Sequence, residues 1–230
     1  MKIIGLIPAR SGSKGLVDKN IVDYQGKPLM AHAINASLES SYINRTIVST
    51  DSIEYANIAR KYNAEIPFIR PLDISQDFTQ DSEVFIHLIE TLNLKEEDIV
   101  VQLRPTNPKR GSNLIDKVLE KLINNKLPAI RTISQASFSP YKMVKLNGEK
   151  IEPILNIEGK KNGTDLPRQL LPKIYELNGN VDAFYVKCIK FYDSFFPNGT
   201  GYYLQQEATA DIDHKSDLIK LKNENRNILQ

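Results

Sequence analysis

The sequence has no tryptophan, a single cysteine and no long apolar run among its 230 residues. One cysteine, Cys188, cannot form a disulfide within the chain, which is typical of a reducing compartment. No apolar run approaches the roughly 18 residues of a membrane helix. The apolar start of the chain is short and is followed by Pro8, so it is typical of a first strand and not of a secretory signal. We therefore expect a soluble, cytoplasmic protein with no membrane partner.

The chain also lacks a strong excess of either charge. Its 30 Lys and Arg residues oppose 28 Asp and Glu residues, for a net charge of +2. Nucleic-acid-binding domains are usually far more basic, so we expect no nucleic-acid partner, and any anion should bind at a local site. The length suits one well-buried α/β domain, and we treat residues 1–230 as a single domain.

Short apolar runs alternate with helical patterns through the first 134 residues. Each run is nearly continuous, as expected of a strand covered on both faces, and the four lie at 2–8, 45–50, 98–103 and 128–134. Helical spacing appears at 82–92 and at 114–123, the latter behind Ser112 as a plausible cap. The pattern predicts a mostly parallel sheet with helices on both faces, which binds its ligands at the carboxyl ends of the strands.

This alternation stops between residues 137 and 178. The segment contains a predicted hairpin that turns at Asn147-Gly148, followed by an irregular stretch, and we interpret it as an insert. After the insert, the pattern predicts a strand and then two helices, at 181–186, 187–196 and 216–229.

The loop that follows the first strand is rich in glycine and positive charge. In LIPARSGSKGLVDKN, residues 6–20, backbone N–H groups of the turn that contains Gly12 and Gly15 can approach phosphate oxygens while Arg10, Lys14 and Lys19 neutralise their charge. The spacing is neither that of a Walker A loop nor that of the dinucleotide motif G-x-G-x-x-G. The loop predicts a triphosphate site, with a solvated basic turn as the alternative.

Two aspartates near the end of the chain, Asp211 and Asp213, alternate about Ile212. If this is the end of a strand, both carboxylates lie on one face and Ile212 faces the core. Such a pair suits Mg²⁺, which proteins usually hold with one or two carboxylates together with substrate phosphates. The alternative is that these acids cap a helix that begins near Ser216; Asp217 better suits that role.

Further candidates lie in two other stretches. In QLRPTNPKR, residues 102–110, the side chains of Gln102, Arg104 and Thr106 would be presented at the carboxyl end of a predicted strand, where a ligand could reach them. In and beside the irregular part of the insert, Lys142 and Arg168 could hold an acidic sugar, because a guanidinium suits a carboxylate. An ordinary turn and a solvated surface are the respective alternatives.

Together these stretches resemble the cytidylyltransferases that activate sialic acid and related nine-carbon acids. The resemblance covers essentially the whole chain and rests on IPARSGSKG…KN, VSTD at 48–51, RP at 70–71, QLRPTNP, LPRQLLP…NG and DIDHKSDL. It implies a Rossmann-like fold whose insert at 137–178 interlocks two subunits as the dimerisation subdomain of a homodimer. The implied reaction joins CMP from CTP to a 2-keto-3-deoxy sugar acid and releases pyrophosphate.

The resemblance also implies roles for individual residues. Arg10 and Lys19 would contact the triphosphate and act in catalysis, and Asp211 and Asp213 would hold Mg²⁺, with Asp211 a possible proton acceptor. The nucleotide would be bound by Arg10, Ser11, Gly12, Lys19, Asn20, Arg70 and Ser82. The sugar would be bound by Gln102, Arg104, Lys142, Arg168 and Asn178.

Two departures from the family pattern bear on the substrates. Val17-Asp18 places a negative charge beside the phosphate loop, so Asp18 either points away or weakens nucleotide affinity. Arg104 and Asn107 stand in LRPTNPKR where the commonest sialic-acid variant reads LQPTSPLR, which favours a legionaminic- or pseudaminic-type sugar. An eight-carbon sugar acid, a sugar 1-phosphate, or a nucleotide-binding module without catalysis are the alternatives.

Overall fold

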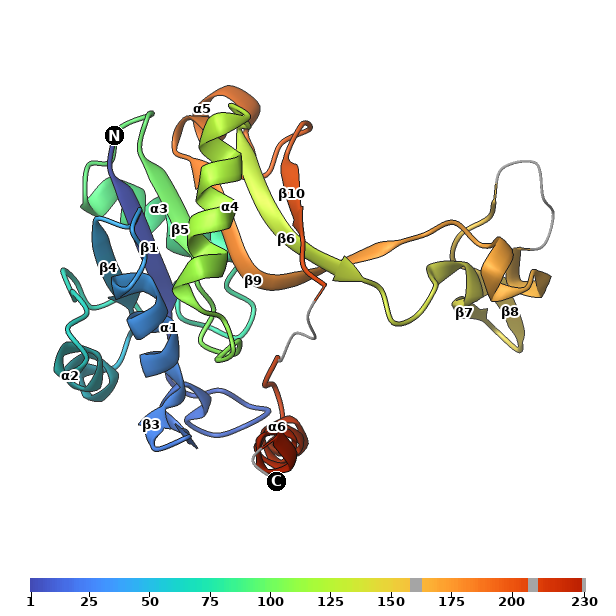
Figure 1. The fold of residues 1–230 in the computed structure, drawn as a ribbon, viewed down its shortest axis with the longest axis horizontal. Coiled ribbons are helices and arrows are strands. Elements are labelled where there is room, and N and C mark those ends of the chain that lie inside the picture. Colours follow the sequence, from blue (N-terminus) through green and yellow to red (C-terminus); the bar gives the residue numbers. More distant parts are fainter. Residues whose placement is uncertain (158–162, 207–210, 229–230) are drawn as a thin grey trace.

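A six-stranded sheet forms the centre of the computed structural model, which describes residues 1–157, 163–206 and 211–228 (Figure 1). In spatial order its strands are β10 (Gly201–Leu204), β6 (Ala129–Gln135), β9 (Tyr175–Tyr185), β5 (Ile99–Gln102), β1 (Ile3–Pro8) and β4 (Arg45–Ser49). These bounds match the four strands expected before residue 134 to within one residue at each end. Near-continuous Val, Ile and Leu runs therefore form strands buried on both faces, as predicted.

The sheet is mostly parallel, with one exception in its interior. β1 pairs in parallel with β4 and β5, and β10 pairs in parallel with β6. β9 lies between β5 and β6 and runs antiparallel to both. The run VDAFYV predicts a buried strand but not its direction, because burial on both faces makes parallel and antiparallel strands look alike in sequence.

Helices cover both faces of the sheet, as expected. Ile3 and Ile7 of β1 face one core, to which α1 (Leu29–Leu38), α2 (Ile53–Lys61) and α4 (Ser112–Asn124) contribute. Ile4 and Leu6 face the other core, with α3 (Asp81–Thr91) and α5 (Lys187–Tyr192). The alternation follows from the two-residue period of a strand. Ser112 is the first residue of α4, and the cap position is Gly111, so that predicted cap is wrong.

An arm whose described residues are 136–157 and 163–174 follows β6 and precedes β9 in the chain, and it projects away from the body (Figure 1). It carries β7 (Val144–Asn147) and β8 (Lys150–Pro153), joined by the predicted turn, in which Gly148 has a φ of 59°. The chain therefore leaves the sheet where the insert was predicted, but it returns before residue 178, the predicted end of the insert. Residues 175–178 belong to β9, where Tyr175 pairs with Gln135 and Leu177 with Ile133.

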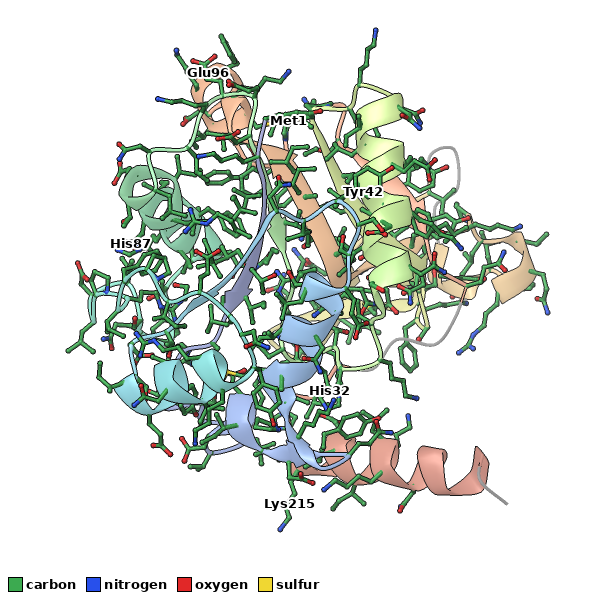
Figure 2. The ribbon with its side chains drawn as sticks, turned by 60° about the vertical axis from the view of Figure 1, so that its left-hand side comes forward. Met1, His32, Tyr42, His87, Glu96 and Lys215 are labelled. Carbon is green, nitrogen blue, oxygen red and sulfur yellow. The ribbon has the colours of Figure 1, made fainter. Side chains whose placement is uncertain are left out.

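A third apolar cluster joins the two ends of the chain. It combines Tyr24, from the hairpin of β2 (Asp23–Tyr24) and β3 (Lys27–Pro28), with Leu218 and Leu221 of α6 (Lys215–Ile228), and Ile212 lies in the same cluster. Figure 2 shows α6 beginning at Lys215 beside the hairpin and α1. Because Ile212 packs in this cluster, Asp211 and Asp213 on either side of it lie near the loop that follows β1. Among the described helices, none is long and apolar enough to span a membrane.

Candidate active site

The opening loop leaves the carboxyl end of β1 and is anchored by side chains of its neighbours. The backbone N–H and the hydroxyl of Ser11 donate to the Asp51 carboxylate, just after β4, at 2.8 and 2.7 Å. Asn20 donates to the carbonyl of Arg10 at 2.9 Å. Burial acts to raise the pKa of Asp51, but the hydrogen bonds from Ser11 outweigh it and the pKa is lowered. The loop is therefore held in one shape with Asp51 ionised.

The late acidic segment meets this loop directly. The Lys19 Nζ lies 2.8 Å from the Asp213 carboxylate, and a Cβ on Gly15 would lie only 2.7 Å from the Asp213 carbonyl oxygen. The backbone N–H of Ile212 donates to the carbonyl of Thr106 at 3.0 Å, which ties the segment to the loop after β5. Gly15 is needed because any side chain there would separate the two segments.

Between these segments lies a cleft of about 470 Å³, at the end of the sheet where β1 and β5 finish. Its described lining is Pro8, Arg10, Ser13, Lys14, Gly15, Lys19, Asn20, Arg70, Ile74, Gln76, Asp77, Thr79, Asp81, Val84, Arg104, Pro105, Thr106, Asp213 and His214. This position agrees with the general rule that open α/β sheets bind ligands beyond the carboxyl ends of their strands.

Several cations in the cleft contact aspartates. Asp77 bridges Arg10, at 2.7 Å, and Lys14, and these partners lower the pKa of its carboxyl. Arg104 contacts Asp81 at 2.7 Å. Ion pairs between partly exposed groups contribute little free energy, so an incoming polyanion can replace these carboxylates.

Arg70 differs from the other cations because it is only 4% exposed. Among the described residues, its Nε and one terminal nitrogen have no hydrogen-bond partner. Burial lowers the pKa of its guanidinium. Buried polar groups are nearly always paired in folded proteins, so a buried guanidinium with open donors in a cleft wall indicates a site for a polar ligand.

The loop after β5 is fixed from behind by a second buried arginine. Arg110 donates to the carbonyl of Asn180 at 2.7 Å and to that of Arg104 at 3.2 Å. Asn107 donates to the carbonyl of Gly179 at 3.4 Å. These contacts set the path of the backbone at Arg104, whose side chain reaches the cleft.

The cleft brings together many of the predicted residues, but not all. Those that line it are Arg10, Lys19, Asn20, Arg70, Arg104 and Asp213. The predicted residues outside its described lining are Ser11, Gly12, Ser82, Gln102, Asn178 and Asp211 on the body, and Lys142 and Arg168 on the arm. Gln102 is only 1% exposed and lies behind the wall. Asp18 also lies outside the lining and accepts a hydrogen bond from Tyr55 at 2.9 Å.

Sequence reasoning missed the acidic side of the cleft. Asp77 and Asp81 lie in QDFTQDS, where polar residues are typical of a solvated loop. Asp77 precedes α3, and Asp81 is the first residue of that helix. No sequence pattern marks this segment as a cleft wall, because its place depends on a tertiary contact, the isolated bridge of Glu65 to Ile47 of β4.

The metal prediction can be compared with the geometry of the late acids. Ile212 is buried between the exposed Asp211 and Asp213, as the alternation required, although no strand forms there. Asp217 accepts hydrogen bonds from the backbone N–H groups of Asp213 and His214 at 3.1 and 2.8 Å, in the helix-terminus role expected of it. Among the described residues, no group of three or more His, Cys, Asp or Glu side chains is placed to hold a metal. Two exposed carboxylates, one of them in the lining of the cleft, still fit Mg²⁺, which takes its other ligands from phosphates and water.

Comparison with known proteins identifies the family. The sequence model of the cytidylyltransferase family matches residues 4–220. The chain belongs to this family. It is 30% identical over 95% of its length to pseudaminic acid cytidylyltransferase of Campylobacter jejuni strain 81-176, covering 94% of that protein. It is 32% identical over 93% of its length to CMP-N,N'-diacetyllegionaminic acid synthase of Legionella pneumophila, covering 90% of it.

Solved structures agree on the fold of this cytidylyltransferase. CMP:2-keto-3-deoxy-manno-octonic acid synthetase, solved in complex with CTP, superposes with a TM-score of 0.72 at 15% identity, covering 99% of each chain. The 4-diphosphocytidyl-2C-methyl-D-erythritol synthase of Anaerococcus prevotii superposes with a TM-score of 0.65 at 14% identity, covering 98% of each chain. At this level of identity the likeness establishes the fold alone.

Proposed function

We propose that this cytidylyltransferase joins CMP from CTP to a nine-carbon 2-keto-3-deoxy sugar acid and releases pyrophosphate. Full-length relatives named for pseudaminic and N,N'-diacetyllegionaminic acids support this class of acceptor. The observation that carries the proposal is the meeting of the cationic opening loop with the Asp213 segment across one cleft, where Lys19 and Asp213 are 2.8 Å apart.

The reaction requires positioning and charge stabilisation more than covalent chemistry. The anomeric hydroxyl of the sugar attacks the α-phosphorus of CTP, a new P–O bond forms, and the bond to the bridging oxygen of the β-phosphate breaks. Arg10, Lys14 and Lys19 lie together where they can stabilise the charge that grows on the leaving pyrophosphate. The hydroxyl proton passes to Asp211, whose exposed carboxylate is a hydrogen-bond acceptor when ionised.

Asp211 and Asp213 are the residues that would hold Mg²⁺. When bound, the ion supplies positive charge at the phosphates and lowers the pKa of a neighbouring hydroxyl. Asp213 also contacts Lys19, so the carboxylate that would hold the ion lies beside a cation that we assign to the phosphates.

We also propose that the arm makes the protein a homodimer. Large exposed apolar side chains are concentrated on the arm and at the start of β9, and they include Phe138, Met143, Leu146, Ile151, Ile154, Leu155, Leu170, Tyr175 and Leu177. Exposed apolar side chains gathered on one part of a molecule mark an interaction surface. In a dimer, Lys142 and Arg168 of one arm would reach the cleft of the partner, where they could bind the acidic sugar.

The test is pyrophosphate release from each of the four nucleoside triphosphates, with Mg²⁺ and a panel of sugar acids. Release should require CTP and a nine-carbon acid. Turnover only with an eight-carbon acid or a sugar 1-phosphate would select the alternative acceptors. CTP binding without turnover on any acid would leave a nucleotide-binding module and contradict the proposal.

A further inference from the structure

A row of polar side chains crosses the sheet beside the cleft. Asp182 of β9 is the cross-strand neighbour of Gln102 on β5 and of Arg131 on β6, so all three lie on the same face. Two residues along the same strands, the corresponding row on this face is apolar and belongs to the core, and it consists of Val100, Phe184 and Ala129. This face of the sheet is therefore apolar at Val100 but polar and charged at Gln102, the last residue of β5, from which the chain enters the cleft.

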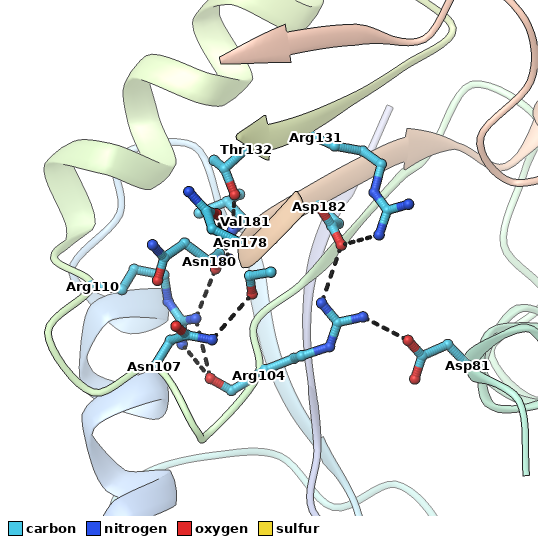
Figure 3. A network of polar contacts seen from close by, with 11 residues as sticks. Asp81, Arg104, Asn107, Arg110, Arg131, Thr132, Asn178, Asn180, Val181 and Asp182 are labelled. Carbon is cyan, nitrogen blue, oxygen red and sulfur yellow. Dashed lines mark hydrogen bonds and ion pairs between the residues drawn. The ribbon is translucent and has the colours of Figure 1, made fainter. Parts of the chain in front are cut away.

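Asp182 is the centre of this row and is fully buried, with 0% exposure. One carboxylate oxygen accepts hydrogen bonds from Arg131, at 3.0 Å, and from Arg104, at 3.3 Å (Figure 3). Among the described residues, its other oxygen has no hydrogen-bond partner. Arg131 also makes a cation–π contact, because its guanidinium carbon lies 4.4 Å from the centre of the Phe196 ring.

Arg104 is the member of this network that reaches the cleft. Its guanidinium spans Asp182 and Asp81, with one terminal nitrogen on each carboxylate (Figure 3). It also lies against Gly179, which has a φ of 63°, and a Cβ at Gly179 would lie 2.5 Å from the Arg104 nitrogen. Asp182, Asp81 and Gly179 together hold the guanidinium in one place.

Burying a carboxylate is costly unless its partners are well placed, and an apolar residue at position 182 would extend the core without that cost. The buried carboxylate fixes a guanidinium that lines the substrate cleft, which gives it a use beyond packing. Of the two carboxylates on Arg104, Asp81 has a half-exposed side chain and can yield to a ligand, whereas Asp182 cannot leave.

We propose that Asp182 is a positioning residue that acts through Arg104, the cleft guanidinium that the family resemblance assigns to the sugar acid. A guanidinium only donates hydrogen bonds, so the group it meets is an acyl carbonyl, a hydroxyl or a carboxylate. This inference rests on the proposed function, because it concerns the acceptor of that reaction.

The first test is Asp182→Asn, with steady-state kinetics for both substrates. The asparagine keeps the shape but loses the charge that holds Arg104, so the KM for the sugar acid should rise about tenfold or more, as expected for a lost charge-assisted hydrogen bond. The KM for CTP should stay unchanged. In an Arg104→Gln background, Asp182→Asn should have no further effect on the KM for the sugar, because there is no guanidinium left to position.

A matched control is Glu65→Gln, which makes the same carboxylate-to-amide change at a surface pair. Glu65 contacts Arg45 at 2.6 Å at the edge of the sheet, and its loss should change neither KM. If Asp182→Asn lowers the unfolding temperature but leaves the KM for the sugar unchanged, Asp182 is only structural and the inference is wrong.

Gly179→Ala tests the same geometry without changing any charge, and serves if Asp182→Asn does not fold. The new Cβ should displace the Arg104 guanidinium and raise the KM for the sugar. Gly26→Ala is its control, because Gly26 also has a positive φ, of 77°, but no described atom lies within 4 Å of the new Cβ. Equal effects of both changes would contradict the inference. If the wild-type protein turns over no sugar acid, the proposed function also fails; wild-type turnover with insensitive variants overturns the inference alone.

Discussion

The cleft and the arm differ in how completely their side chains are partnered. In the cleft, Arg10, Lys19 and Arg104 each contact an aspartate, and the loops are tied by backbone hydrogen bonds. On the arm, Leu146 and Ile151 are directly opposite each other on β7 and β8 and are 81% and 66% exposed. One chain therefore builds a complete cleft by itself, whereas the arm presents apolar surface that we propose a second copy covers.

The largest effect is expected on turnover, from a substitution that tests the proposed chemistry of the cleft. Asp211→Asn removes the proposed proton acceptor, so turnover should fall by about 10²- to 10⁴-fold, the usual range for a general base. The KM for CTP should change little, because the cations that bind phosphate remain. Equal, small changes in both parameters would show that the role of Asp211 is misassigned. Glu65→Gln provides the unaffected control.

The next effect tests the arm. Replacing Leu146 and Ile151 together by Asp should weaken self-association by about thirtyfold or more, since a central interface contact contributes about 2 kcal/mol. Sedimentation should then show a monomer at concentrations where the wild type is a dimer. Ile219→Asp, at an exposed apolar site on α6, should leave the mass unchanged. A wild type that is already monomeric would remove the role we give the arm.

A smaller effect separates the buried cation from the exposed ones. Arg70→Ala should raise the KM for CTP about tenfold, because it removes the buried donors that lack a partner in the described structure. The KM for the sugar acid should stay within the error of the measurement. If CTP binds as tightly as in the wild type, Arg70 has only a structural role and the nucleotide lies elsewhere.

The smallest expected effect is a gain in CTP affinity, whereas the preceding substitutions all cause a loss. Asp77 occupies Arg10 and Lys14, so CTP must displace its carboxylate. Asp77→Asn should therefore lower the Kd of CTP about twofold, a size typical of an exposed ion pair. Isothermal titration with CTP would measure it, and weaker binding would indicate that Asp77 contacts the nucleotide directly.

Much of the fold could be predicted from local patterns. The buried strands, the helices on both faces and the turn at Gly148 follow from apolar runs, helical spacing and the Asn-Gly pair. The direction of β9 could not be predicted, because its burial on both faces hides it. The start of β9 at Tyr175 was also missed, because its first residues are mostly exposed and alternate between apolar and polar, unlike the continuous apolar runs of the strands that are covered on both faces.

The site was predictable where charge and glycine occur together. The opening loop and Asp213 do meet, as their chemistry suggested. Asp77, Asp81 and Asp182 were not found, since their roles depend on which cations the fold brings to them. Asp182 lies within an otherwise apolar run and is recognisable only when Arg104 and Arg131 are seen to converge on it.

The most direct test of the central claim is a crystal structure of the protein with CTP and magnesium. The account predicts the triphosphate between the Arg10–Lys19 loop and the Asp211–Asp213 segment, with the ion on those aspartates and Asp77 moved off its cations. A nucleotide bound elsewhere, or phosphates that contact neither segment, would contradict it.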